Sequence, residues 1–502
     1  MIVLAVLLTS ALAAALPTRQ PALVTEANNG RSRTVDSHRQ GPSPDLPISD
    51  PRLAPRGGVE QVHVTIGAFG LIVEGRWSVF VSWSTNGTAL PEASMVKYME
   101  ASDLGAVKQG NAVWMTATGP PGSVYSTLQD PPPWATPGPA TGCGPFKYTD
   151  PSCYYTSGAL HTTELVDLKP AMRYVYRVVG DTRQWSFSTP PAPGAAHASF
   201  GVVGDLGQTQ NSSKTVENML NALHEGQIGQ VLFPGDLSYA DGDGVRWDTF
   251  ARLGEPLWAT VATAHIGGNH EFSSGGENWV HYRARYPNFQ ATQAGAHLAS
   301  KGSGSFLWYS YETGPAHVVM LCSYAASHAG SSQYAWLQRD LASVDRAVTP
   351  WLIVVMHTPF YTSNAHHPMS EGAAMRAAIE PLLLGASVDL VFSGHVHAYE
   401  RTYRVANGAL SAAGPAYITI GDGGNREAFA YPWLKDQPEW SALREYAYGF
   451  GKLDVNRTHA VFTWLRNDDP WNPSPGPVGD LVVYESTHAA RGRRGGPSTA
   501  TS

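Results

Sequence analysis

Two short stretches decide the fold: FGVVGDLG at residues 200–207 and VLFPGDLSY at residues 231–239. Each begins with apolar residues, which predict a buried strand, and each then reaches Gly-Asp, which predicts a turn. Between them, apolar residues recur at helical spacing, at Val216, Met219, Leu220 and Leu223. A strand, a helix and a second strand in this order predict an α/β layered domain with buried strands.

The same alternation continues toward the C-terminus. Periodic apolar residues predict helices over 333–341 and 373–384. Short apolar runs predict further strands over 351–356, 388–392, 416–420 and 459–464. We therefore expect one domain over residues 197–486, built on mixed sheet and flanked by helices.

The region before this domain has a different pattern. Residues 58–192 alternate in short β-like runs separated by turn residues, with no helical period, as at 61–66, 78–83 and 173–179. This pattern predicts an all-β sandwich. Residues 119–153 are rich in Pro and Gly, so we expect a long surface loop there, and residues 189–194 are expected to link the two domains.

The two ends of the chain are expected to lie outside the folded domains. Residues 1–16 are almost wholly apolar and end in small residues, which is typical of a signal peptide. The stretch has no Lys or Arg at its N-terminal end, where signal peptides usually carry one. A membrane span is the alternative, but it needs about 20 apolar residues and Pro17 follows here. Residues 17–57 are expected to be a leader or linker, and residues 487–502 a disordered tail.

Composition excludes several classes of protein. The 502 residues are 43% hydrophobic and 15% charged, which is too apolar for a disordered chain. Lys and Arg number 34 against 41 Asp and Glu, so the net charge of −7 argues against a generic nucleic-acid binder. Three cysteines are too few for a disulfide scaffold.

Several residues agree with secretion. Asn-x-Ser/Thr sequons predict glycosylation at Asn86, Asn211 and Asn456. Cys143 and Cys153 flank the Pro/Gly-rich loop and could pair in an oxidising compartment. Cys322 lies in an apolar run and is expected to be a buried free thiol.

Polar residues follow five of the apolar runs: Asp205, Asp236, Tyr239, Asn269, His357, His395 and His397. In open α/β sheets, ligands bind just past the carboxyl ends of the strands, so these residues are expected to converge. Oxygen and imidazole donors without thiolate suit Fe, Mn or Zn. Seven donors exceed the needs of one ion, and a carboxylate can bridge two. Two ions about 3.5–4 Å apart would suit in-line displacement at phosphorus by bound hydroxide.

The five segments also occur in a known order. Asp-x-Gly (205–207), Gly-Asp-x-x-Tyr (235–239), Gly-Asn-His-Glu (268–271), Val-x-x-His (354–357) and Gly-His-x-His (394–397) make the chain resemble a purple acid phosphatase of the large plant type. These enzymes belong to the calcineurin-like metallophosphoesterases. The resemblance covers roughly residues 58–485. It implies an α/β (α+β) metallophosphoesterase sandwich of mixed sheets flanked by helices, preceded by an all-β fibronectin-III-like domain.

The resemblance assigns roles to the residues. Asp205, Tyr239 and His397 would bind Fe(III), and Asp236 would bridge it to a divalent ion (Zn, Mn or Fe) bound by Asn269, His357 and His395. A phenolate at Tyr239 favours ferric ion and would give the purple colour. His270, His366 and His367 would complete the catalytic site. The His366–His367 pair would contact phosphate, and one of the two would protonate the leaving alkoxide.

The chain is therefore expected to be a secreted acid phosphatase that hydrolyses phosphate monoesters, its partners being small phosphate esters. A phosphodiesterase or phytase-like specialist on the same metal core is one alternative. A secreted binding protein with a vestigial metal site is another. Secretion could end outside the cell, in the cell wall or in the vacuole. No Cys follows His397 by about 20 residues, where some relatives form an inter-subunit disulfide, so any homodimer is expected to be non-covalent.

Overall fold

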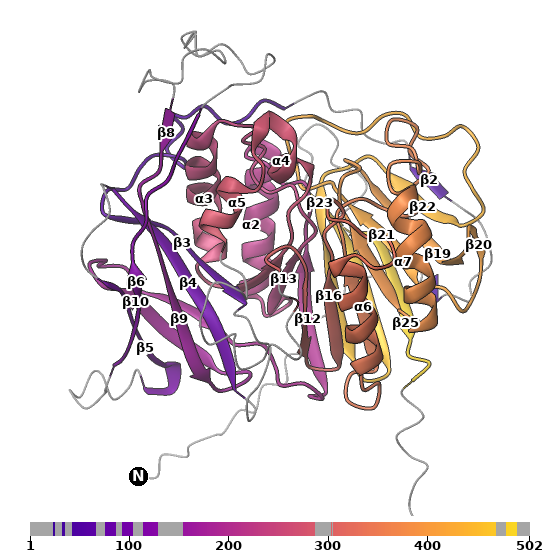
Figure 1. Cartoon of the computed structure of the whole chain (residues 1–502), viewed down its shortest axis with the longest axis horizontal. Helices are drawn as coiled ribbons and strands as arrows, with labels where there is room; N and C mark the ends of the chain where they lie inside the picture. The colour runs from indigo at the N-terminus through magenta and orange to yellow at the C-terminus, as the bar shows by residue number, and fades with distance from the viewer. Residues whose placement is uncertain are drawn as a thin grey trace, which may run out of the picture.

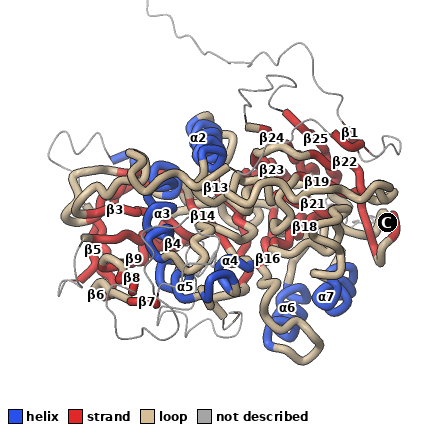
Figure 2. The backbone as a smooth tube through the Cα atoms, turned by 90° about the horizontal axis from the view of Figure 1, so that it is seen from above, coloured by secondary structure: helices blue, strands red, loops and turns tan. Residues whose placement is uncertain are grey.

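Two large β-sheets lie face to face at the centre of the computed structural model, and helices cover their outer faces (Figures 1 and 2). The structure describes residues 24–25, 33–35, 43–66, 76–86, 93–103, 114–128, 154–286, 303, 305–467 and 478–488. The expected signal peptide at residues 1–16, Cys143, Cys153 and residues 489–502 of the expected tail lie outside these ranges.

The first sheet has ten strands within the described residues. Its order is β1 (Val24–Thr25), β25 (Val478–Glu485), β24 (His459–Arg466), β23 (Gly449–Asn456), β12 (His197–Val202), β13 (Gln230–Phe233), β14 (Ala262–His265), β3 (Val59–Ile66), β4 (Trp77–Thr85) and β9 (Ala159–Leu168). Strands β12, β13 and β14 are parallel, while β12 pairs antiparallel with β23.

The second sheet has nine strands in the described part of the chain. Its order is β15 (Tyr309–Thr313), β16 (Ala316–Met320), β17 (Trp351–Val355), β18 (Leu390–Ser393), β21 (Ala416–Ile420), β19 (Tyr399–Ala406), β22 (Ser441–Glu445) and β2 (Arg33–Val35), with β20 (Ala409–Leu410) paired to β19. Strands β16, β17, β18 and β21 run parallel. Both sheets are therefore mixed, as the sequence predicted.

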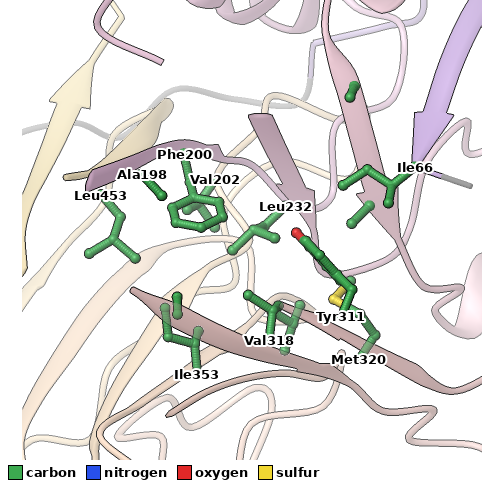
Figure 3. Packing of buried hydrophobic residues seen from close by; sticks show 14 of the residues in the cluster. Ile66, Ala198, Phe200, Val202, Leu232, Tyr311, Val318, Met320, Ile353 and Leu453 are labelled. Atoms are coloured by element: carbon green, nitrogen blue, oxygen red, sulfur yellow. The ribbon is translucent and has the colours of Figure 1, made fainter. Parts of the chain in front are cut away.

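Apolar side chains fill the space between the two sheets (Figure 3). Phe200 and Leu232 of the first sheet face Val318 and Ile353 of the second, and all four are buried. The strands are apolar on both faces because their outer faces are also covered, by helices. This dry interface fixes how the carboxyl ends of the two parallel strand groups lie relative to each other.

Helices cover the outside of each sheet. On the first lie α2 (Gln210–His224) and α3 (Gly244–Trp258), which share a buried cluster with β13 and with Val203, just after β12. On the second lie α6 (Ser332–Ser343) and α7 (Ala373–Gly385), which confirm the helices predicted there. Shorter helices are α4 (Asn269–Phe272), α5 (Val280–Arg285), η1 (Ala101–Asp103) and η3 (Ser274–Gly276). None of the described helices is long and apolar enough to cross a membrane.

Strands are the main regular elements in the described part of residues 58–192, where the single-turn η1 is the one helix. A four-stranded sheet of β11 (Trp185–Ser188), β10 (Arg173–Val178), β5 (Ala93–Glu100) and β6 (Met115–Pro121) lies against β3, β4 and β9, and β7 (Ser126–Leu128) pairs with β8 (Tyr154–Thr156). The region does not stand apart, however, because β3 pairs with β14 through Thr65 and Thr263. Strands β3, β4 and β9 therefore continue the first large sheet.

Two expectations for irregular segments were wrong in part. The Pro/Gly-rich stretch that begins at Gly119 contains the end of β6 and all of β7. The prolines at 120 and 121 are tolerated because β6 is an edge strand that pairs only with β5. Residues 43–57 of the expected linker also fold onto the catalytic region, where Leu46 and Leu53 are buried against Leu253.

Some smaller expectations concern single residues. Cys322 is a buried free thiol, as predicted. Of the three sequon asparagines, Asn86 and Asn456 are exposed, whereas Asn211 is half-buried in the first turn of α2.

Candidate dinuclear metal centre

The predicted donors gather where the parallel strands of both sheets end. Asp205, Asp236 and Asn269 follow β12, β13 and β14 of the first sheet. His357 and His395 follow β17 and β18 of the second. Parallel strands present their carboxyl ends at one edge, so five loops from distant parts of the chain meet at a single place.

Four of these residues have a left-handed backbone. The φ angles are 54° at Asp205, 53° at Asp236, 54° at Tyr239 and 69° at His395. Each such position costs a residue with a Cβ about 1–2 kcal/mol. The backbone amide of His395 donates to both carboxylate oxygens of Asp205, at 2.9 Å each, which joins the two sheets at this point. These left-handed turns direct the side chains toward one another.

One half of the cluster is formed by Asp205, Tyr239 and His397. The Tyr239 hydroxyl lies 3.2 Å from Asp205 Oδ1 and 2.8 Å from His397 Nε2. His397 Nε2 is also 3.4 Å from Asp205 Oδ1, and its Nδ1 lies 3.1 Å from the carbonyl oxygen of Ala428, to which it can donate. That second contact leaves Nε2 free to offer its lone pair to the cluster.

The other half is formed by Asn269, His357 and His395. Asn269 Oδ1 lies 3.0 Å from His357 Nε2 and 2.9 Å from His395 Nδ1. His357 Nδ1 is 2.7 Å from the carbonyl oxygen of Pro234, which again directs Nε2 inward. The Tyr324 hydroxyl donates to the same Asn269 oxygen at 3.1 Å.

Asp236 lies between the two halves. Its Oδ2 is 3.5 Å from the Tyr239 hydroxyl and 3.1 Å from His357 Nε2. Burial would raise the pKa of the Asp236 carboxyl, but the neighbouring His357 and His270 hold it below its usual range. The carboxylate is thus ionised and contacts donors from both sheets, as a bridging ligand must.

The donor set fits a pair of hard or borderline cations. Two buried carboxylates, three imidazoles, a phenol and an amide oxygen converge without any thiolate. Asp236, His357 and His395 offer ligand atoms within 4.8 Å of one another. Burial, followed by the Asp205 and Asp236 carboxylates, raises the pKa of the Tyr239 phenol well above its usual range. Only a cation among these groups would favour the phenolate.

His270 follows Asn269 and lies beside this cluster. Its ring centroid is 4.0 Å from that of Tyr239, and its backbone amide donates to Asp236 Oδ1 at 2.9 Å. Its Nδ1 lies 2.5 Å from Asp241 Oδ1 and its Nε2 3.5 Å from Glu427 Oε1. Burial opposes the charged ring, but Asp236 and Asp241 raise the pKa of His270 well above its usual value. The two carboxylates therefore favour the protonated form of the ring.

The predicted His366–His367 pair lies on a loop that reaches the same cluster. The ring of His367 is 4.6 Å from that of His395 between centroids, and His366 is exposed next to it. Asn364 Oδ1 accepts both backbone amides, from His366 at 2.8 Å and from His367 at 2.9 Å. Burial, followed by the charge on His395, lowers the pKa of His367 to about 4.

Sequence analysis missed several residues that support these side chains. Glu371 contacts His367 at 3.2 Å and His395 at 2.7 Å. Its spacing of four residues from His367 was a usable signal. Asp241 was also missed, although it follows Tyr239 by only two residues. Nothing in the local sequence pointed to Arg426, which reaches both Asp241 and the Tyr239 carbonyl from a distant loop.

Glu271, the last residue of the Gly-Asn-His-Glu motif, joins the loop after β13 to the loop after β14. Its carboxylate accepts the backbone amides of Asp236, Leu237 and Gly268, at 2.8–2.9 Å. Burial, followed by the Asp236 charge, raises the pKa of Glu271 to about 7. Gly268 itself leaves no room for a side chain, since a Cβ there would lie 2.1 Å from Asp236 Oδ1.

Comparison with known families agrees with this geometry. Residues 198–399 match the model of the calcineurin-like phosphoesterases, and residues 414–472 match that of the iron/zinc purple acid phosphatase-like protein C domain. The chain is 38% identical to purple acid phosphatase 1 of Ipomoea batatas over 452 residues, 85% of either chain. It is 43% identical to purple acid phosphatase 18 of Arabidopsis thaliana over 319 residues, 63% of this chain and 70% of that one.

Another similar protein is named Fe(3+)-Zn(2+) purple acid phosphatase 12 of Arabidopsis thaliana, 39% identical over 336 residues, 63% of this chain and 70% of that one. Among solved structures, the purple acid phosphatase PPD1 of yellow lupin (Lupinus luteus) superposes with a TM-score of 0.65 at 21% identity. The match covers 85% of this chain and 74% of that one. At that identity the likeness supports the fold, including the α/β arrangement with mixed sheets.

Proposed function

The chain belongs to the purple acid phosphatase family and is a phosphatase, and on that basis we propose that it hydrolyses phosphate monoesters at acid pH with a dinuclear Fe(III)–M(II) centre. The observation that carries this proposal is the division of the seven donors into two halves, with Asp236 in contact with both. In this proposal Asp205, Tyr239 and His397 hold Fe(III). Asn269, His357 and His395 hold a divalent Zn, Mn or Fe ion.

When bound, two such ions would supply Lewis acidity and an activated water for in-line attack on phosphorus. The chain's own residues do the rest. His270, held as a cation by Asp241, binds a phosphoryl oxygen and stabilises the negative charge that develops in the transition state. His366 is exposed and His367 is half-buried beside His395, and one of the two protonates the leaving oxygen.

The surroundings of His367 bear on the pH at which the leaving group is protonated. Burial and the charge on His395 lower the pKa of His367 to about 4. An imidazole with a low pKa is protonated only at acid pH, and its imidazolium form gives up the proton readily. We therefore assign an acid optimum to leaving-group protonation, with Glu371 orienting His367 through Nδ1.

A phosphodiesterase or phytase-like specialist on the same core is the second candidate function. It shares every donor, because specificity lies in the loops around the metal centre. One similar protein, from Allium cepa, is named a phosphoenolpyruvate phosphatase, at 43% identity over 340 residues. Relatives that share this core therefore carry different substrate names, which is the reason to measure several substrates.

Further features belong to the same proposal. We infer that the chain is secreted to an extracellular, cell-wall or vacuolar location and glycosylated at Asn86, Asn211 and Asn456. A fibronectin-III-like sandwich at residues 58–192 is supported by the two packed sheets of that region. A disulfide between Cys143 and Cys153 and a non-covalent homodimer complete the proposal.

The experiment that tests the function combines metal analysis, a visible spectrum and rates on three substrates. p-Nitrophenyl phosphate, bis(p-nitrophenyl) phosphate and inositol hexakisphosphate would be compared from acid to neutral pH. We expect about two metals per chain, a purple band and a clear preference for the simple monoester. Asp236→Asn should lose metal and activity, whereas the exposed Asp436→Asn should keep both. A fully active, metal-loaded Asp236→Asn protein would refute the proposed centre.

A further inference from the structure

The N-terminal segment at residues 43–56 is attached to the loops that build the metal centre. The Leu46 amide donates to the carbonyl oxygen of Gln208 at 2.9 Å, and Asp45 forms a β-bridge with Thr209. The Arg246 guanidinium donates to the Leu46 carbonyl at 2.8 Å. The segment therefore lies along the loop that leads from Asp205 into α2, although the two are more than 150 residues apart in the sequence.

Asp45 carries the charged contact of this segment. Its carboxylate Oδ2 accepts from Arg426 Nη1 at 2.7 Å and lies 3.9 Å from Arg246 Nε. The Asp45 side chain is only 8% exposed, so solvent screens the pair weakly. A buried carboxylate of this kind fixes its cationic partner in one position.

The Arg426 guanidinium also contacts residues beside the metal centre. Nη1 also donates to the backbone carbonyl of Tyr239, and Nη2 donates to Asp241 Oδ2. The other oxygen of Asp241 lies 2.5 Å from His270 Nδ1. A continuous series of side-chain contacts thus runs from Asp45 through Arg426 and Asp241 to His270.

We propose that Asp45 is a positioning residue for phosphate binding, which acts through Arg426 on Asp241 and His270. The inference rests on the proposed role of His270 in binding a phosphoryl oxygen. The planar guanidinium offers donors in a fixed fork, so fixing one nitrogen orients the other. Without the Asp45 carboxylate, Arg426 keeps one anionic partner at Asp241 but loses the contact that sets its angle.

The alternative is that Asp45 only anchors the segment. Asp50 provides the comparison, since it holds Arg52 at 2.8 Å and Arg52 in turn donates to Ser213 on α2. That pair attaches the same segment to the same domain, yet it has no connection to Asp241. A positioning role predicts different behaviour for the two aspartates, and an anchoring role predicts the same behaviour.

The test uses the full-length, metal-loaded protein with inorganic phosphate as the probe. Calorimetry would give the dissociation constant of phosphate for the wild type, Asp45→Asn, Asp50→Asn and Arg426→Lys. Hydrogen exchange of the amides at 239–243 would report the order of the loop without reference to activity. Steady-state kinetics would separate KM from kcat, and a thermal melt would record any change in stability.

We expect Asp45→Asn to weaken phosphate binding about 5- to 20-fold and to raise KM by a similar factor. Exchange at 239–243 should accelerate, and kcat should fall as well, because His270 also stabilises the charge of the transition state. Asp50→Asn should lower the melting temperature at most. The double variant Asp45→Asn/Arg426→Lys should bind phosphate no more weakly than Arg426→Lys alone, because both changes interrupt one series of contacts.

Wild-type phosphate affinity and exchange in Asp45→Asn would overturn the inference, and so would fully additive effects in the double variant. Equal defects in Asp45→Asn and Asp50→Asn would show anchoring only. If Asp45→Asn fails to fold, Asp45→Glu keeps the charge and should retain slow exchange and near-normal phosphate affinity; loss of both would also refute positioning. If His270→Asn binds phosphate like the wild type, the proposed role of His270 fails instead.

Discussion

The Tyr239 hydroxyl lies 2.8 Å from Nε2 of His397, although the two residues come from different sheets. Tyr239 reaches this position from the left-handed turn after β13, and His397 from the turn after β18. The contact therefore depends on how the two sheets are packed, and it can be tested through the colour of the protein.

Tyr239→Phe should remove the visible charge-transfer band while leaving the fold intact. The ring keeps its packing against His270, and the variant loses only the oxygen that a ferric ion would bind. The measurement is an absorption spectrum with metal analysis on the same sample. Tyr431→Phe, at an exposed tyrosine, is the control and should keep the colour. An unchanged band in Tyr239→Phe would mean that another group absorbs.

Gly268→Ala should abolish activity and metal binding. A Cβ at this position would lie 2.1 Å from Asp236 Oδ1 and 2.7 Å from His357 Cε1, so one of these side chains must move. Gly385→Ala, at the end of α7 with open space around it, is the matched control and should behave as wild type. Metal content and phosphatase rate check both variants. Retained metal in Gly268→Ala would show that the loop can shift at little cost.

Glu271→Gln should lower the free energy of unfolding by about 2 kcal/mol, because a buried amide NH₂ would face backbone donors that now meet a carboxylate. The three donors are the amides of Asp236, Leu237 and Gly268. Urea unfolding measures the effect. Glu217→Gln, on the exposed face of α2 beside Lys214, should change stability by only a few tenths of a kcal/mol. Similar losses in both variants would contradict this account.

Asn364→Ala should slow the hydrolysis of esters with poor leaving groups more than that of esters with good ones. The substitution releases the backbone of His366 and His367 from their shared acceptor. A positioned general acid contributes roughly 10²–10⁴-fold when the leaving group needs a proton, so misplacing it should cost part of that factor. Comparing kcat for β-glycerophosphate and p-nitrophenyl phosphate measures the difference. An equal loss on both substrates would argue against leaving-group protonation by this loop.

The buried pair of His317 and Asp340 should make stability fall at alkaline pH. Burial opposes the charge on His317, but Asp340 at 3.0 Å and Glu312 raise its pKa to about 9. The unfolded value is about 6.5, so the stabilisation is complete below that pH and is lost as pH rises toward 9. Removing the histidine should therefore cost on the order of 2 kcal/mol below pH 6.5 and little above pH 9.

Urea unfolding of His317→Gln at acid and alkaline pH checks this difference. The exposed His328→Gln is the control and should follow the wild type at both pH values. A variant as stable as the wild type at acid pH would show that the pair contributes no net stabilisation.

The sequence predicted the parts of the fold that depend on local pattern. Apolar runs gave β12, β13 and β17, and helical spacing gave α6 and α7. It could not predict that β3 joins β14, because register between distant strands depends on packing and not on periodicity. The prolines of β6 were misleading for a related reason, since only an edge position makes them acceptable.

The candidate donors were predictable because each lies within a few residues of the end of an apolar strand. Their supporting residues were not, since Glu427 and Arg426 come from a loop whose sequence carries no separate signal. Asp45 illustrates the limit most clearly: it lies in a Pro-rich stretch typical of a linker, and only the folded chain brings it beside Arg426.

The pairing of β12 with β23 also constrains biosynthesis. β12 is the strand that leads to Asp205, yet its antiparallel neighbour spans Gly449–Asn456 and leaves the ribosome much later. Gly204, just after β12, likewise donates to the carbonyl of Ile420. Until those late segments emerge, the nascent chain presents an unpaired apolar edge, which is prone to aggregation. Folding of the catalytic half is therefore expected to be post-translational and to benefit from chaperones.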